Sequence, residues 1–152
     1  MDKTDRVQRA QDLFLSGYNC AQSVMLAFAD LYNVPQELAL KMAAPFGGGI
    51  GRMRQTCGAA CGMFLLAGLE RGAVLPTDKE GKTATYALVQ ELAAEFKARN
   101  GSLLCGELLG LRAMQLSPVP EERTPQYYAK RPCLRMVESA CRIYQEHLDK
   151  QV

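Results

Sequence analysis

The chain has 152 residues and a mass of 16.7 kDa, which is enough for one domain with its own hydrophobic core. Apolar residues make up 48% and charged residues 22%, and the formal net charge is only +2, so neither nucleic acid nor an anionic membrane is an expected partner. The polar N-terminus lacks the apolar stretch of a secretory signal. No apolar run is long enough to cross a bilayer. We therefore expect a cytoplasmic protein without membrane insertion.

Almost every segment has the apolar spacing of an amphipathic helix. Helices are predicted, in chain order, over residues 4–16, 19–32, 35–44, 56–71, 83–99 and 132–149. Asn19 is the expected N-cap of the second helix, and Pro35 is expected in the first turn of the third. Ser102 caps a short helix that ends near Leu109, and residues 112–131, with three prolines, are predicted as an ordered loop.

No segment has the alternating pattern of a strand. The predicted fold is therefore all-α, a compact helical bundle of about five to six helices, with a Gly-rich loop before the central helix. Residues 1–152 are expected to form a single domain.

The chain has six cysteines, which in a reducing compartment are more often ligands, nucleophiles or buried apolar residues than disulfide partners. Four of them lie where a helix is predicted to begin, namely Cys20, Cys57, Cys105 and Cys133. The free N–H groups and the dipole at a helix start favour a negative group there. Such a thiol should lose its proton more easily, and the thiolate is both the nucleophile and the metal ligand.

The other two cysteines differ in position. Cys61 lies four residues after Cys57, on the same helix face. Cys141 lies within the apolar stripe of the last helix and is predicted to be a small buried residue. Because the four helix-start cysteines are far apart in sequence, a zinc finger is disfavoured. An iron–sulfur cluster or a dithiol that cycles through a disulfide both remain open.

The Gly-rich loop reads FGGGIGRMR over residues 46–54. It lacks the Gly-Lys-Ser/Thr ending of a P-loop and does not fit G-x-G-x-x-G, so it is not a phosphate cradle. Its glycines instead indicate a backbone that passes close to another group, with N–H groups free to bond sulfur or an anion. Arg52 and Arg54 could add positive charge beside Cys57, and solvated arginines are an equally good interpretation.

The arrangement of these motifs resembles the redox-active protein family with the signature C…CGAxxG…C…C, the C-GCAxxG-C-C family. The resemblance covers residues 5–145. It is carried by the four helix-start cysteines, the loop 46–52 and the segment Cys57–Gly62, and it includes NCAQSVMLAFAD near the start. The chain is also similar to the non-haem part of split-Soret cytochromes, which implies an iron–sulfur centre and a homodimer. No C-x-x-C-H haem-attachment motif is present.

Three hypotheses follow. In the first, which the resemblance favours, an iron–sulfur cluster of the [2Fe–2S] type carries single electrons to a redox partner protein, with Cys20, Cys57, Cys105 and Cys133 as ligands. The cofactor would also contact the residues Gly47, Gly48, Gly49, Gly51, Arg52 and Gly58.

In the second hypothesis, the chain is a thiol–disulfide redox protein or sensor. Cys57 is the attacking thiolate, and Cys61 or Cys20 resolves the mixed disulfide. In the third, a non-redox binding protein uses its cysteines for a structural metal or for packing.

Overall fold

The computed structural model describes residues 3–110 and 117–151. Within these ranges the chain forms eight α-helices and two short 3₁₀ helices, without a strand, which confirms the all-α prediction. The helices are α1 (Lys3–Leu15), α2 (Cys20–Phe28), η1 (Ala29–Tyr32), α3 (Gln36–Ala43), η2 (Ala44–Phe46), α4 (Gly58–Arg71), α5 (Lys79–Asn100), α6 (Cys105–Leu108), α7 (Pro125–Lys130) and α8 (Cys133–Asp149).

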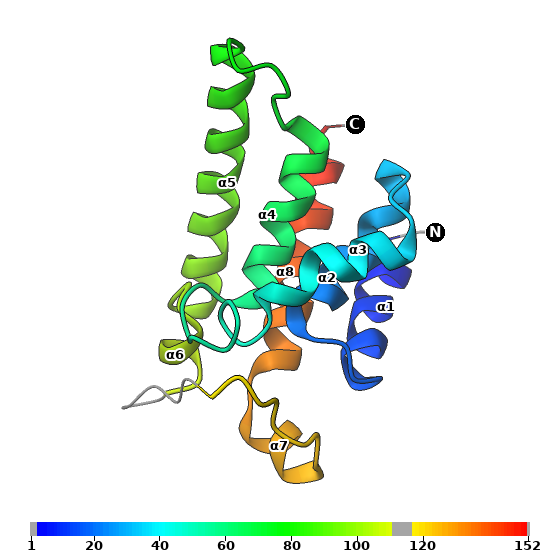
Figure 1. The fold of residues 1–152 in the computed structure, drawn as a ribbon, viewed down its shortest axis with the longest axis vertical. Coiled ribbons are helices and arrows are strands. Elements are labelled where there is room, and N and C mark those ends of the chain that lie inside the picture. Colours follow the sequence, from blue (N-terminus) through cyan, green and yellow to red (C-terminus); the bar gives the residue numbers. More distant parts are fainter. Residues whose placement is uncertain (1–2, 111–116, 152) are drawn as a thin grey trace.

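Helices α4, α5 and α8 run side by side along the long axis of the molecule, and α2 packs against both α4 and α8 (Figure 1). The core lies between them and includes Phe28 of α2, Leu66 of α4 and Tyr144 of α8, each fully or almost fully buried. The rings of Phe28 and Tyr144 meet edge to face, with centroids 5.1 Å apart. In the part of the chain that the structure describes, no helix is both long and apolar enough to cross a membrane.

A close contact between α2 and α4 explains why the last residue of the segment Cys57–Gly62 is glycine. A Cβ atom on Gly62 would lie 2.8 Å from the Cβ atom of Val24. Because real Cβ atoms do not approach so closely, only glycine lets the two helices pack at this distance. The start of α4 is thereby held beside the start of α2.

Several boundaries differ from the prediction. Helix α5 begins at Lys79, earlier than the expected residue 83, because the Asp78 side chain accepts a hydrogen bond from the Gly81 amide and caps the helix there. The expected loop 112–131 contains α7, which Thr124 caps and Pro125 opens. Residues 111–116 lie outside the described residues.

The predicted Ser102 cap is wrong, and Pro35 lies one position before its predicted place in the first turn of α3. Helix α6 begins at Cys105 with Leu104 as its N-cap, and the Ser102 hydroxyl instead accepts a hydrogen bond from the Leu104 amide. Pro35 is the N-cap of α3 and lies before its first turn. The Asn19 cap is confirmed, because its side chain accepts a hydrogen bond from the Gln22 amide.

Candidate functional site

The starts of α2, α4, α6 and α8 meet at one end of the bundle, beside the Gly-rich loop (Figure 1). There they surround a cavity of about 70 Å³, which we call the cysteine cavity. Its lining includes all four of the cysteines that the sequence placed at helix starts: Cys20, Cys57, Cys105 and Cys133. All four are free thiols. The structure therefore brings together residues that are far apart in sequence.

Two glycines allow the backbone to approach these cysteines. A Cβ atom on Gly49 would lie 2.6 Å from the Cβ atom of Cys105, and one on Gly58 would lie 3.3 Å from the Cβ atom of Cys20. The Gln55 carbonyl also accepts a hydrogen bond from the Cys105 amide over 2.6 Å. The prediction that the loop backbone passes close to another group is confirmed at Gly49.

The Gly-rich loop is a left-handed turn. Residues 48–52 all have positive φ, between 57° and 75°, and Arg54 has a φ of 61°. Glycine adopts this conformation freely, but Ile50, Arg52 and Arg54 do so at a cost of roughly 1–2 kcal/mol each. The loop keeps this shape through hydrogen bonds from the amides of residues 50–52, 54 and 55 back to carbonyls of residues 45–49.

Those same hydrogen bonds correct one expectation. The loop amides were predicted to be free to bond sulfur or an anion. The amides of Arg52, Arg54 and Gln55 instead donate to the carbonyls of Gly47, Gly48 and Gly49. The loop therefore contributes its shape and its arginine side chains to the site, while these amide donors are already used.

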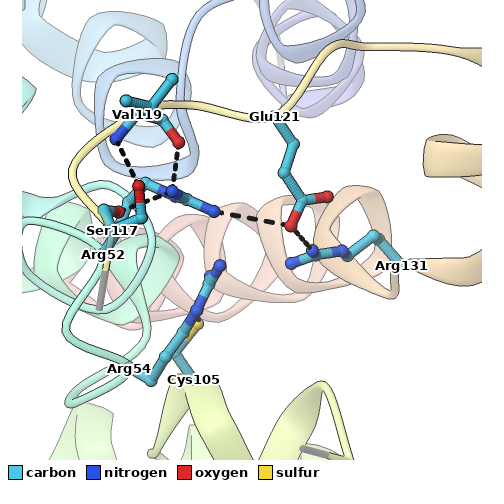
Figure 2. Close-up of polar contacts among 7 residues, drawn as sticks. All are labelled: Arg52, Arg54, Cys105, Ser117, Val119, Glu121 and Arg131. Carbon is cyan, nitrogen blue, oxygen red and sulfur yellow. Dashed lines mark hydrogen bonds and ion pairs between the residues drawn. The ribbon is translucent and has the colours of Figure 1, made fainter. Parts of the chain in front are cut away.

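Arg54 is hydrogen-bonded to a cysteine. Its guanidinium Nη1 donates a hydrogen bond to Cys105 Sγ over 3.6 Å (Figure 2). The side chain is only 4% exposed, and among the described residues no hydrogen-bond partner reaches its Nε atom. A buried guanidinium with an unused donor is uncommon in folded proteins, where such groups are nearly always paired.

Arg52 has a different role. Its Nη1 donates to the carbonyls of Ser117 and Val119, and its Nη2 lies 3.4 Å from a carboxylate oxygen of Glu121. Arg131 binds the same oxygen of Glu121 (Figure 2). Arg52 therefore holds the segment 117–121 against the loop, and the alternative of a freely solvated Arg52 is wrong.

Arg123 extends the positive lining of the cysteine cavity. Its guanidinium donates to the carbonyls of Phe14 and Tyr18 and lies over the Phe14 ring, 4.3 Å from its centroid. Arg54, Arg123 and Arg131 all line the cavity together with the cysteines. Sequence reasoning missed Arg123 and Arg131 because both come from the segment that was predicted as a loop, and no local motif marks them.

Cys20 and Cys133 interact with each other across the cavity wall. Hydrogen bonding with Cys20 lowers the pKa of Cys133 to about 7, with further help from the charges of Arg131, Arg123 and Arg54 and in spite of burial. The same hydrogen bond, together with burial, raises the pKa of Cys20 well above its usual value. Cys133 is therefore the more acidic thiol of the two.

Cys57 does not have the lowered pKa that its place at a helix start predicted. It is the N-cap residue of α4, one position before the helix. Burial raises its pKa to about 12, and hydrogen bonds from the Ala59 and Ala60 amides offset only part of that effect. Burial also raises the pKa of Cys105, although Arg54 opposes the change.

Cys61 lies outside the lining of the cysteine cavity. Its thiol donates weakly to the Thr56 carbonyl over 3.9 Å, and burial raises its pKa to about 11. Cys141 is fully buried in the core between helices, as predicted.

In residues 3–110 and 117–151, no group of three or more His, Cys, Asp or Glu side chains is placed so that it could hold a metal ion. The four cysteines share a cavity, but their present arrangement does not form a ligand set.

The fold and this site define an all-helical protein with four cysteines gathered at one end of the bundle. The chain belongs to the family described as "Putative redox-active protein (C_GCAxxG_C_C)", whose model matches residues 18–147. The central segment of the family's printed signature, GCAxxG, has Gly before Cys. In this chain the order is reversed, with Cys57 before Gly58. No curated protein and no solved structure matches the chain.

Proposed function

We propose that this redox-active protein works by thiol–disulfide exchange, with Cys133 as the attacking thiolate and Cys20 as the resolving thiol. The observation that carries the proposal is that Cys20 and Cys133 line the same small cavity, together with three arginines, and that each thiol shifts the pKa of the other. A thiolate whose thiol has a pKa close to the ambient pH attacks disulfides most effectively. Cys57, the attacking residue expected from sequence, is protonated at neutral pH.

The exchange transfers two electrons from the protein thiols to the partner disulfide. The Cys133 thiolate attacks one sulfur of a disulfide, the S–S bond of that disulfide breaks, and one half leaves as a thiolate. Cys20 gives its proton to a leaving thiolate and attacks the Cys133 sulfur, which releases the second half. The protein pair is oxidised by two electrons to a disulfide, and the partner disulfide is reduced to two thiol groups, one of which takes its proton from water. The reverse sequence oxidises a dithiol.

The test is a count of free thiols before and after a mild disulfide oxidant. We expect the count to fall from six to four in the wild type. Cys20→Ala and Cys133→Ala should each prevent the loss of two thiols by disulfide formation, whereas Cys61→Ala should still lose two thiols. An unchanged count in the wild type would favour the non-redox binding role instead.

A [2Fe–2S] cluster is the second candidate. It is supported by the four cysteines around one cavity, together with arginines whose charge would offset that of a thiolate-bound cluster. Cys20, Cys57, Cys105 and Cys133 would hold it, after the side chains rearrange, and it would supply one-electron transfer. Protein purified without oxygen would then be brown and contain iron and acid-labile sulfide in equal amounts. The expected partner protein and homodimer stay predictions.

A further inference from the structure

A second cavity opens beside the cysteine cavity. Its volume is about 320 Å³, and we call it the arginine cavity because its lining includes four arginines: Arg52, Arg54, Arg123 and Arg131. Only one carboxylate, that of Glu121, is among the described residues that line it. The local charge is therefore strongly positive, although the net charge of the whole chain is only +2.

The two cavities adjoin. Arg54, Arg123 and Arg131 line both of them, as do Asn19, Gly48 and Tyr127. A group held in the arginine cavity would therefore lie next to the cysteines. Figure 2 shows the Arg54 side chain extending from Cys105 toward the cluster of Arg52, Glu121 and Arg131.

Arg54 has a buried donor atom without a partner among the described residues. Glu121 and two backbone carbonyls occupy Arg52, and two other carbonyls occupy Arg123. Arg54 is almost fully buried, and no partner among the described residues reaches its Nε atom. A buried guanidinium without a carboxylate partner is costly unless an anion completes its hydrogen bonds.

The access to the cysteines limits the size of what can reach them. Cys20 and Cys133 are partly buried, and Cys57 and Cys105 are buried. The cavity that the four cysteines share holds only about 70 Å³, a space suited to a small molecule. A small molecule that fits the arginine cavity can extend its sulfur atoms toward Cys133.

We infer that the arginine cavity binds the oxyanion group of a small disulfide or thiol, such as one that bears carboxylates, and presents its sulfur to Cys20 and Cys133. This inference rests on the proposed thiol–disulfide exchange, because it names the class of the molecule that exchanges. The guanidinium of Arg54 provides the buried donor for the oxyanion, and Arg131 provides positive charge at the rim.

The experiment compares three small disulfides of similar size that differ in charge: 3,3′-dithiodipropionate (anionic), 2-hydroxyethyl disulfide (neutral) and cystamine (cationic). For each disulfide, the rate at which it oxidises the protein is divided by the rate at which it oxidises a small model thiol. This ratio corrects for the intrinsic reactivity of the disulfide. We expect the normalised rate of the anionic disulfide to exceed that of the cationic one by about tenfold or more at low salt. Added salt should reduce this preference.

Variants assign the preference to the cavity. Arg54→Gln and Arg131→Gln should each lower the normalised preference for the anionic disulfide, and Arg131→Gln provides the test if Arg54→Gln does not fold. Arg142→Gln is the matched control, because Arg142 is exposed on α8 and pairs with Glu138 on the same helix. It should leave the preference unchanged.

A thioether that cannot exchange separates binding from redox chemistry. 3,3′-Thiodipropionate should protect the wild-type protein from oxidation by the anionic disulfide, and should protect Arg54→Gln and Arg131→Gln less. If all three disulfides oxidise the pair at equal normalised rates and the thioether gives no protection, the inference is wrong although the exchange function stands. If no disulfide oxidises the pair while the thioether still binds, the proposed exchange is wrong and the cavity remains an anion site.

Discussion

Cys20, the first residue of α2, and Cys133, the first residue of α8, line the same cavity, and their interaction raises the pKa of Cys20 and lowers that of Cys133. Two helices that are far apart in sequence thus place one thiol beside another at a positively charged cavity. The pair makes the two cysteines chemically different: Cys133 ionises near neutral pH, and Cys20 keeps its proton.

The reactivity of Cys133 should therefore depend on pH in a defined way. Only the thiolate reacts with iodoacetamide, so the alkylation rate follows the ionised fraction. Because the pKa of Cys133 is lowered to about 7, its rate should rise about tenfold per pH unit below pH 7 and level off above it. Mass spectrometry of the alkylated peptides measures the rate at each cysteine. A midpoint near the ordinary thiol value of 9.0 would contradict the assignment.

Removal of the Cys20 thiol should raise the pKa of Cys133. The hydrogen bond from Cys20 is the largest of the effects that lower this pKa, and Cys20→Ala removes it. The alkylation midpoint of Cys133 should move upward, although the charges of the arginines remain. Cys61→Ala is the control, since Cys61 lies outside the cavity lining. In this variant the alkylation midpoint of Cys133 should equal that of the wild type. Equal midpoints in Cys20→Ala and wild type would show that the hydrogen bond has no effect.

The close approach of Gly49 to Cys105 can be tested by comparing the free energy of unfolding of Gly49→Ala with that of Gly51→Ala. Gly49 and Gly51 both have positive φ, but only at Gly49 would a Cβ atom meet other atoms, 2.6 Å from the Cβ atom of Cys105. Gly51→Ala should lower the free energy of unfolding by about 1 kcal/mol, from the left-handed conformation alone. Gly49→Ala should lower it by at least about 2 kcal/mol more, from the clash. Urea unfolding provides both values, and equal losses would mean that the contact is not as close as described.

The capping box at the start of α2 should stabilise the helix that presents Cys20. The Asn19 side chain accepts from the Gln22 amide over 2.9 Å, and its Nδ2 donates to the Ala44 carbonyl over 3.1 Å. Asn19→Ala should lower the free energy of unfolding by about 1–2 kcal/mol. Asn19→Ser keeps the cap and should cost clearly less. Thermal unfolding of the two variants gives the comparison, and a smaller loss for alanine than for serine would contradict the cap.

Much of the fold could be predicted from the sequence because helical periodicity is a strong local signal. The segments around α1, α2, α4 and α8 were placed within a few residues. The start of α5 was missed because the polar run Thr77–Lys82 has the composition of a turn, while Asp78 uses its side chain to begin a helix there. Helix α7 was missed because Pro125 was interpreted as a loop signal, although it occupies the first turn of a helix.

The candidate site was less predictable. The cysteines at helix starts could be found because caps and glycines mark those positions in the sequence. Their pKa values could not be predicted, because the helix dipole favours ionisation while burial opposes it, and burial depends on the whole fold. The pKa of Cys57 is raised and that of Cys133 is lowered, although both residues lie at a helix start. Arg123 and Arg131 reach the cavity only through tertiary folding.

Disulfide mapping tests the central claim most directly. The reduced protein would be oxidised with a mild disulfide reagent, the remaining thiols blocked, and the peptides analysed by mass spectrometry without reduction. The account predicts one dominant disulfide, between Cys20 and Cys133. A dominant disulfide between Cys57 and Cys61, or no intramolecular disulfide while the four cavity cysteines stay free, would contradict it.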